Sequence, residues 1–87
     1  MRVTFKSYDG HAEEVFDMPE IPQCGDFFTF VEHEGNTDLD RENNEKAASF
    51  MQMDTENDGT RYFVVSREFY SDGSVSVVLR SQTFFSF

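Results

Sequence analysis

The sequence has few of the residues that cross-link, target or anchor a small protein. Cys24 is its only cysteine, so no disulfide can form within the chain, whereas secreted scaffolds of this size usually carry several. Its apolar runs are far shorter than a membrane span, and Arg2 and Lys6 interrupt the first apolar positions, where a signal peptide needs a continuous core. We therefore expect a cytoplasmic protein with no membrane partner.

Leucine and isoleucine are also scarce. The chain has two Leu and one Ile against eleven Phe, three Tyr and eight Val. Leucine is a common core residue of helices, whereas aromatic and β-branched side chains pack well on the pleated surface of a sheet. A chain of 87 residues is long enough for one hydrophobic core and too short for two. The composition predicts a single, mainly β domain over residues 1–87.

Basic residues are outnumbered by acidic ones. Seven Lys and Arg stand against 17 Asp and Glu, which gives a formal net charge of −10. A charge of this sign and size repels nucleic acid and anionic lipid and attracts basic surfaces. The segment from Glu32 to Asp58 holds nine of the acids and two of the bases, so it carries most of the negative charge. We expect a protein partner with a basic surface and no direct binding of nucleic acid.

Much of the chain alternates apolar and polar residues with the period of two that is typical of strands. Pro19 and Pro22 interrupt the pattern, because proline removes a backbone donor from a sheet. The pattern and the turn residues between its segments predict strands at 2–8, 13–18, 27–32, 60–70 and 75–80, with hairpin turns at 9–10, 57–59 and 71–74.

The C-terminal segment 84–87 contains three phenylalanines. These rings either close the sheet as a last short strand or remain exposed as a docking patch formed by Phe84, Phe85 and Phe87. We favour closure, because small barrels remove their open edges by pairing the terminal strands.

The segment 33–58 interrupts the strands as an acidic insertion. Thr37, followed three residues later by Asp40, resembles a capping box and favours a loop or a short helix near 38–46. Residues 48–54 alternate again and lead into Asn57-Asp58-Gly59, a strong hairpin signal, so we expect a strand there. A short helix somewhere in 38–51, with Leu39, Ala47, Phe50 and Met51 on one face, is the competing interpretation.

Two parts of the chain resemble the small SH3-like β-barrel proteins of phages and bacteria. The matching residues are Ile21-Pro22-Gln23-Cys24-Gly25-Asp26-Phe27 and the later segments 62–65, 69–70 and 75–79. The resemblance covers about half of the chain, and the acidic insertion departs from it. It implies a small antiparallel barrel, or a strongly bent sheet of five or six strands, with room for one short helix in the insertion. It also implies a binding or accessory role, and the host cytoplasm as the location if the chain is phage-encoded.

One stretch has the spacing of a calcium-binding loop. Asp54, Glu56 and Asp58 occupy its first, third and fifth positions, and Gly59 occupies the sixth. The twelfth position, which supplies a bidentate acid in such loops, is Val65. These three acids are therefore a weak calcium candidate, and we predict no metal site and no cofactor.

Nucleophilic catalysis would require Cys24 or a serine beside a histidine base. His11 and His33 are the only histidines, and both lie in polar stretches where solvent exposure is the expected state. The acids lie in turns and polar runs, whereas a catalytic acid pair needs an enclosing cleft. We predict that the protein is not an enzyme.

These observations predict a small acidic protein-interaction module. One form of this hypothesis is a phage-type inhibitor, or a decoy that mimics nucleic acid and binds a basic protein surface. The alternative is an accessory or structural protein that forms oligomers and has no catalytic activity, with acidity serving solubility only. The partner-binding residues we expect are the acids of the insertion: Glu32, Glu34, Asp38, Asp40, Glu42 and Glu45.

Overall fold

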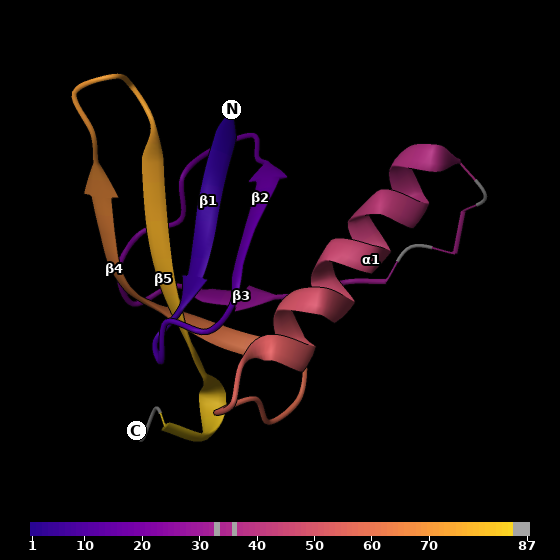
Figure 1. Cartoon of the computed structure of the whole chain (residues 1–87). Helices are drawn as coiled ribbons and strands as arrows, with labels where there is room; N and C mark the ends of the chain where they lie inside the picture. The colour runs from indigo at the N-terminus through magenta and orange to yellow at the C-terminus, as the bar shows by residue number, and fades with distance from the viewer. Residues whose placement is uncertain (33, 36, 85–87) are drawn as a thin grey trace.

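The computed structural model describes residues 1–32, 34, 35 and 37–84. Its strands form one sheet in the order β2-β1-β5-β4-β3, and a helix lies beside the β2 edge (Figure 1). The elements are β1 (Arg2–Ser7), β2 (Glu13–Asp17), β3 (Phe27–Thr29), α1 (Asp38–Met53), β4 (Arg61–Phe69), β5 (Val75–Ser81) and the 3₁₀ turn η1 (Gln82–Phe84).

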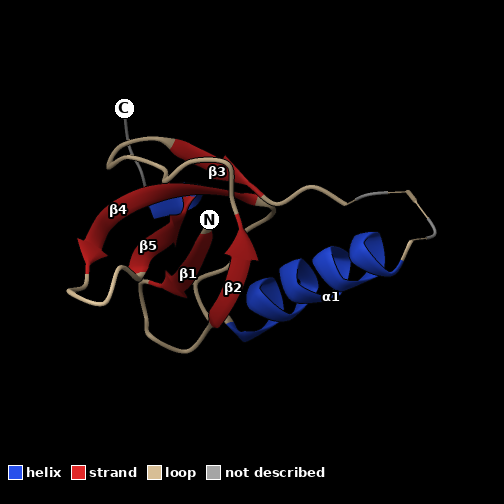
Figure 2. Ribbon diagram, turned by 90° about the horizontal axis from the view of Figure 1, so that it is seen from above, coloured by secondary structure: helices blue, strands red, loops and turns tan. Residues whose placement is uncertain are grey.

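The prediction of a mainly β, strongly bent sheet with one helix is confirmed. Figure 2 shows β4 arching across the sheet, and a register shift between Val64 and Ser66 marks a bulge in this strand. One pair departs from the antiparallel arrangement that we expected: β1 and β5 run parallel, with Thr4 opposite Ser76. A parallel pair needs a long crossover, and the chain between β1 and β5, which includes β2, β3, α1 and β4, provides it.

The expected strand at 48–54 is wrong, because α1 continues through these residues to Met53. Its first turn is capped as predicted, with the Thr37 side chain accepting a hydrogen bond from the Asp40 backbone N–H (3.1 Å). Ala47 and Phe50, three residues apart, are buried on one helix face. A short alternating stretch cannot be told from part of a helix by sequence alone, and burial of Phe50 decides in favour of the helix.

Other boundaries also differ from the expectations. The turn at 57–59 connects α1 to β4, so it is not a hairpin turn. The third strand ends at Thr29 instead of residue 32, although Phe30 N–H still donates to the Thr60 carbonyl (3.0 Å). The expected closing strand begins at Phe84, which here ends η1, and its residues 85–87 lie outside the described part of the chain.

Aromatic rings join α1 to the sheet. Phe50 of α1 is fully buried, with ring centroids 5.1 Å from Phe30 and 5.6 Å from Tyr62. Phe5 and Phe16 continue the cluster on β1 and β2, with their centroids 5.7 Å apart. Valines and Leu79 complete the core, as the Phe-rich and Leu-poor composition suggested. The sheet and the C-terminal half of α1 therefore share one hydrophobic core.

Candidate interaction surface

The N-terminal half of α1 extends away from the strands. Figures 1 and 2 show the helix beside β2, with its C-terminal end near the sheet and its N-terminal end pointing outward. Phe50 and Ala47 hold the C-terminal half in the core, whereas Leu39 near the N-terminus is 75% exposed. The helix thus presents its first two turns to solvent from an anchored base.

Three of the predicted partner-binding acids share the outward face of α1. Asp38, Glu42 and Glu45 follow the i, i+4, i+7 spacing of one helix face, which lies opposite the buried Ala47. The Asp38 side chain is 98% exposed and pairs with Arg41 (2.6 Å). Glu42 pairs with Lys46 (3.1 Å). The helix therefore carries an exposed carboxylate stripe flanked by two basic residues.

The other three predicted acids lie around the start of the helix. Asp40 accepts a hydrogen bond from the Thr37 hydroxyl (2.8 Å), so its carboxylate is engaged at the helix N-terminus. Glu32 and Glu34 are exposed on the segment that leads into α1. A Cβ atom added at Gly35 would clash with the Asp40 carboxylate, so this segment passes close to the helix start. We call Glu32, Glu34, Asp38, Glu42 and Glu45 the acidic face.

An open groove of about 820 Å³ separates the first half of α1 from β2. Leu39 and Asn43 contribute to its helix wall, and Val15 and Phe16 contribute to its strand wall. Met18 and Met1 also line the groove, and Met1 is 60% exposed. Sequence reasoning missed the groove because its walls are far apart in the chain. The only available signal was Leu39, a single large apolar residue within a long polar stretch.

Lys46 connects the helix to the sheet edge. Its ammonium group donates to the Val15 carbonyl of β2 (2.9 Å) and pairs with Glu42. The bonds from Ser7 N–H to the Ala12 carbonyl and from Met18 N–H to the Met1 carbonyl set the β1–β2 register so that Val15 directs its carbonyl outward. Lys46 therefore covers an acceptor at the middle of an edge strand.

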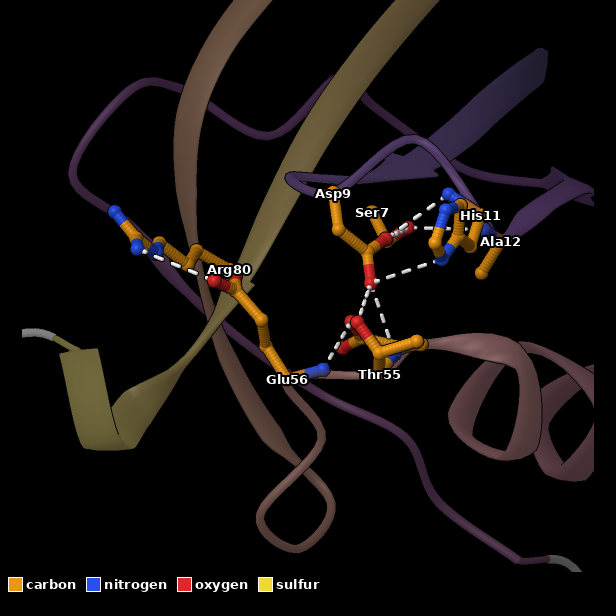
Figure 3. A network of polar contacts seen from close by, with 8 residues as sticks. Ser7, Asp9, His11, Ala12, Thr55, Glu56 and Arg80 are labelled. Carbon is orange, nitrogen blue, oxygen red and sulfur yellow. Dashed lines mark hydrogen bonds and ion pairs between the residues drawn. The ribbon is translucent and has the colours of Figure 1, made fainter.

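A polar network centred on Asp9 lies at the opposite end of α1 (Figure 3). One Asp9 carboxylate oxygen accepts from the Ser7 hydroxyl (2.5 Å) and from His11 N–H (2.9 Å). The other accepts from Thr55 N–H (2.8 Å) and from the Thr55 hydroxyl. Burial alone would raise the pKa of Asp9, but these hydrogen bonds outweigh it and hold that pKa well below its usual range.

Ser7, Asp9 and His11 have the residue types of a catalytic triad without its arrangement. The Ser7 hydroxyl donates to Asp9 and accepts from Ala12 N–H (2.9 Å), and Ser7 is 3% exposed. His11 Nδ1 lies 3.7 Å from Asp9. In a triad the serine bonds to the histidine, and the acid orients that histidine. Here the acid bonds to the serine directly, so the network holds a turn in place.

The weak calcium candidate is not assembled. Asp54 caps the C-terminus of α1 and accepts from Glu56 N–H (3.1 Å), Glu56 pairs with Arg80 (3.3 Å), and the Thr83 hydroxyl donates to Asp58. The three carboxylates therefore serve three different contacts. Over residues 1–32, 34, 35 and 37–84, no group of three or more His, Cys, Asp and Glu side chains is arranged to hold a metal ion.

Asp54 also lies beside a buried tyrosine. The Tyr62 hydroxyl accepts a hydrogen bond from the Asn57 side chain (2.6 Å), and Tyr62 is fully buried. This burial, together with the nearby Asp54 carboxylate, raises the pKa of Tyr62 above its ordinary value. Both groups help to connect the end of α1 to β4.

The residues predicted to dock through the C-terminus are described only in part. Phe84 is the last residue of η1, and Phe85 and Phe87 fall outside the described ranges.

Among the described residues, none of the helices has an apolar stretch of the length that a membrane span requires. Comparisons with protein-family models, curated proteins and solved structures found no match for the chain.

Proposed function

We propose that the chain is a protein-interaction module that presents its acidic face to a basic surface of another protein. The observation that carries this proposal is the position of Asp38, Glu42 and Glu45 on the outward side of a helix that projects from the sheet (Figure 1). Clustered carboxylates accelerate association with basic partners. Anchoring by Phe50 presents them on a pre-ordered helix, which reduces the entropy lost on binding.

The ion pairs within α1 are compatible with such a role. The Asp38–Arg41 pair is solvent-exposed, and exposed pairs contribute little to stability, at most about 1 kcal/mol. Glu42 is also exposed, whereas its partner Lys46 is half-buried and keeps its bond to the Val15 carbonyl. A partner's arginine can therefore replace the Arg41 contact with Asp38 at small cost. Arginine also forms bidentate bonds to a carboxylate, which gives it an advantage over a single lysine contact.

The charge density of α1 favours a basic protein surface over a close imitation of nucleic acid. From Asp38 to Glu45 the helix rises by about 10 Å, at 1.5 Å per residue. Duplex DNA carries one charge per roughly 1.7 Å, or about six over that length. The helix offers three outward acids there, with Arg41 close by. A decoy function would require further acids, such as Glu32 and Glu34, to complete the pattern.

The test compares two triple variants with the same change in net charge. One is Asp38→Asn/Glu42→Gln/Glu45→Gln, and its matched control is Glu13→Gln/Glu20→Gln/Glu68→Gln, which neutralises three exposed acids elsewhere. Each chain is used for affinity capture from a lysate of the native host, and any captured partner is titrated against purified chains at low and high salt. We expect the first variant to lose the partner and the control to retain it. Equal retention by both variants would refute the proposal.

Self-association through exposed apolar side chains is the second candidate function, with acidity serving solubility. Phe69 is 60% exposed and Tyr70 is 42% exposed at the β4–β5 hairpin, and such side chains occur at docking surfaces. Sedimentation of the full chain and of a chain ending at Gln82 tests this candidate together with the predicted C-terminal docking patch. Monomers that remain folded in both cases would exclude it.

A further inference from the structure

The groove between α1 and β2 has an apolar lining that the acidic face does not account for. Leu39 is 75% exposed on its helix wall, and Met18, which also lines the groove, is partly buried against the core. Adjacent exposed apolar side chains with polar surroundings are typical of interaction sites.

The rim of this groove is acidic on its helix side. Asp40 and Glu42 line it from α1, and Asp17 lines it from the end of β2. Arg2, Lys46 and the N-terminal ammonium group of Met1 also line it, and they balance these three acids: the Met1 ammonium group pairs with Asp17 (2.9 Å), and that of Lys46 is held by Glu42 and by the Val15 carbonyl. The excess of negative charge beside the groove therefore comes from the outward acids of α1. The acidic stripe on the outward face of α1 adjoins the same rim. A ligand complementary to these groups is apolar on one side and basic on its flanks.

The edge of β2 indicates which form of ligand fits. Addition of a strand to β2 would use the outward main-chain groups of this edge, but the Val15 carbonyl is occupied by Lys46 (2.9 Å). Recognition in the groove therefore depends on side chains. A helix presents an apolar stripe and basic flanks without main-chain pairing, and methionine walls adapt to such a stripe.

We propose that the groove between α1 and β2 binds a cationic amphipathic helix of a partner protein. Its apolar side chains contact Leu39 and Met18, and its basic side chains contact the acidic face. This inference rests on the proposed function and adds to it the location of the site and the form of the ligand.

The probe is a fluorescently labelled lysine- and leucine-containing peptide of about fourteen residues, long enough for roughly four helical turns. A peptide of the same composition, with its leucines dispersed around the helix, is the control ligand. Binding is measured by fluorescence anisotropy for the unsubstituted chain and for Leu39→Ser. The matched control variant is Phe69→Ser, because Phe69 is also largely exposed but lies on β4, away from the groove.

We expect Leu39→Ser to weaken binding of the amphipathic peptide about tenfold, since a leucine buried on binding contributes about that factor. Phe69→Ser should change the affinity less than about twofold. Leu39→Met, which keeps a large apolar side chain, should retain most of the affinity of the unsubstituted chain. Amide chemical shifts should change along α1 and β2, and the isotope-labelled peptide should be helical when bound. Urea unfolding of each variant verifies that the fold is retained.

Three results would overturn the inference: equal affinity for the dispersed-leucine peptide, equal affinities of Leu39→Ser and Phe69→Ser, or a bound peptide that is extended and pairs with β2. The Asp38→Asn/Glu42→Gln/Glu45→Gln variant separates this inference from the proposed function. If that variant weakens binding and Leu39→Ser does not, the acidic face is supported and the groove is rejected. If the opposite holds, the groove is supported and the role of the acidic face is rejected.

Discussion

Asp9 connects two loops that are distant in the sequence. Its carboxylate holds Ser7 and His11 in the β1–β2 turn and also Thr55, which follows α1, 46 residues away in the chain. The Asp9-Gly10 pair predicted the turn, but it gave no indication of the contact between Asp9 and Thr55. Only 13% of the Asp9 side chain remains exposed. This residue therefore contributes to tertiary structure in addition to forming a local turn.

Asp9→Asn should destabilise the protein at pH 7 by about 1–3 kcal/mol, because hydrogen bonds to a carboxylate are stronger than those to an amide. The pKa of Asp9 is lowered by folding, so its stabilisation is present above the unfolded pKa, about 3.9, and is lost as the pH falls through the folded value. The stability difference between the two proteins should therefore narrow below about pH 4.

Urea unfolding at pH 7 and at several pH values between 4 and 3 measures this difference. Glu45→Gln is the control, because it makes the same carboxylate-to-amide change at an exposed helix position and should cost no more than about 0.5 kcal/mol. A stability difference for Asp9→Asn that does not vary with pH would contradict the conclusion that folding lowers the pKa of Asp9.

Other acids show why a count of charges is a poor guide to a surface. Asp54 is among the nine acids of the segment 32–58, yet it is 4% exposed at the helix C-terminus. Glu56 pairs with Arg80, and its side chain is 24% exposed. The charge accessible to a partner is therefore concentrated on the acidic face, at the N-terminal part of the segment.

At the scale of elements, α1 and β2 depend on each other through Lys46. The helix wall and the strand edge form the groove together, and the Lys46–Val15 contact joins them. An uncovered edge strand offers unpaired main-chain groups to another chain. Coverage of this edge is therefore a second role for a helix whose outward face is acidic.

Lys46→Met should increase concentration-dependent self-association relative to the unsubstituted chain, because it uncovers the Val15 carbonyl at the β2 edge. Sedimentation velocity over a range of protein concentrations measures this effect. Arg41→Met is the control, since it removes the same charge from α1 at a position paired with Asp38. If both variants associate to the same extent, loss of charge is the cause, and the role of Lys46 at the edge is rejected.

At the scale of the whole molecule, the aromatic core makes the helix and the sheet one cooperative unit. Phe50 reaches from α1 to Phe30 and Tyr62, and β1 pairs with β5 from the other end of the chain. Segments from the whole length of the sequence therefore contribute to one core. Helix and sheet should accordingly unfold in a single transition.

Phe50→Ala should lower the free energy of unfolding by about 3–5 kcal/mol, because it leaves a cavity among these rings. Met53→Ala, at a position 53% exposed on the same helix, should cost much less. Far-ultraviolet dichroism at 222 nm follows α1, and near-ultraviolet dichroism follows the buried Tyr62. Loss of the helix signal at a lower urea concentration than the tyrosine signal would show that α1 is a separate unit.

The sequence by itself determined the strand-rich composition, the turns at 9–10 and 71–74, the Thr37 cap and the acidic character of the segment 32–58. These features follow from local propensities and from the period-two pattern, which act over a few residues. Only the tertiary structure decided the helical state of 48–53, because Phe50 is buried in a helix by rings from distant segments. It also decided the parallel β1–β5 pair and the groove beside β2, since contacts between distant residues leave no periodic signal in the chain.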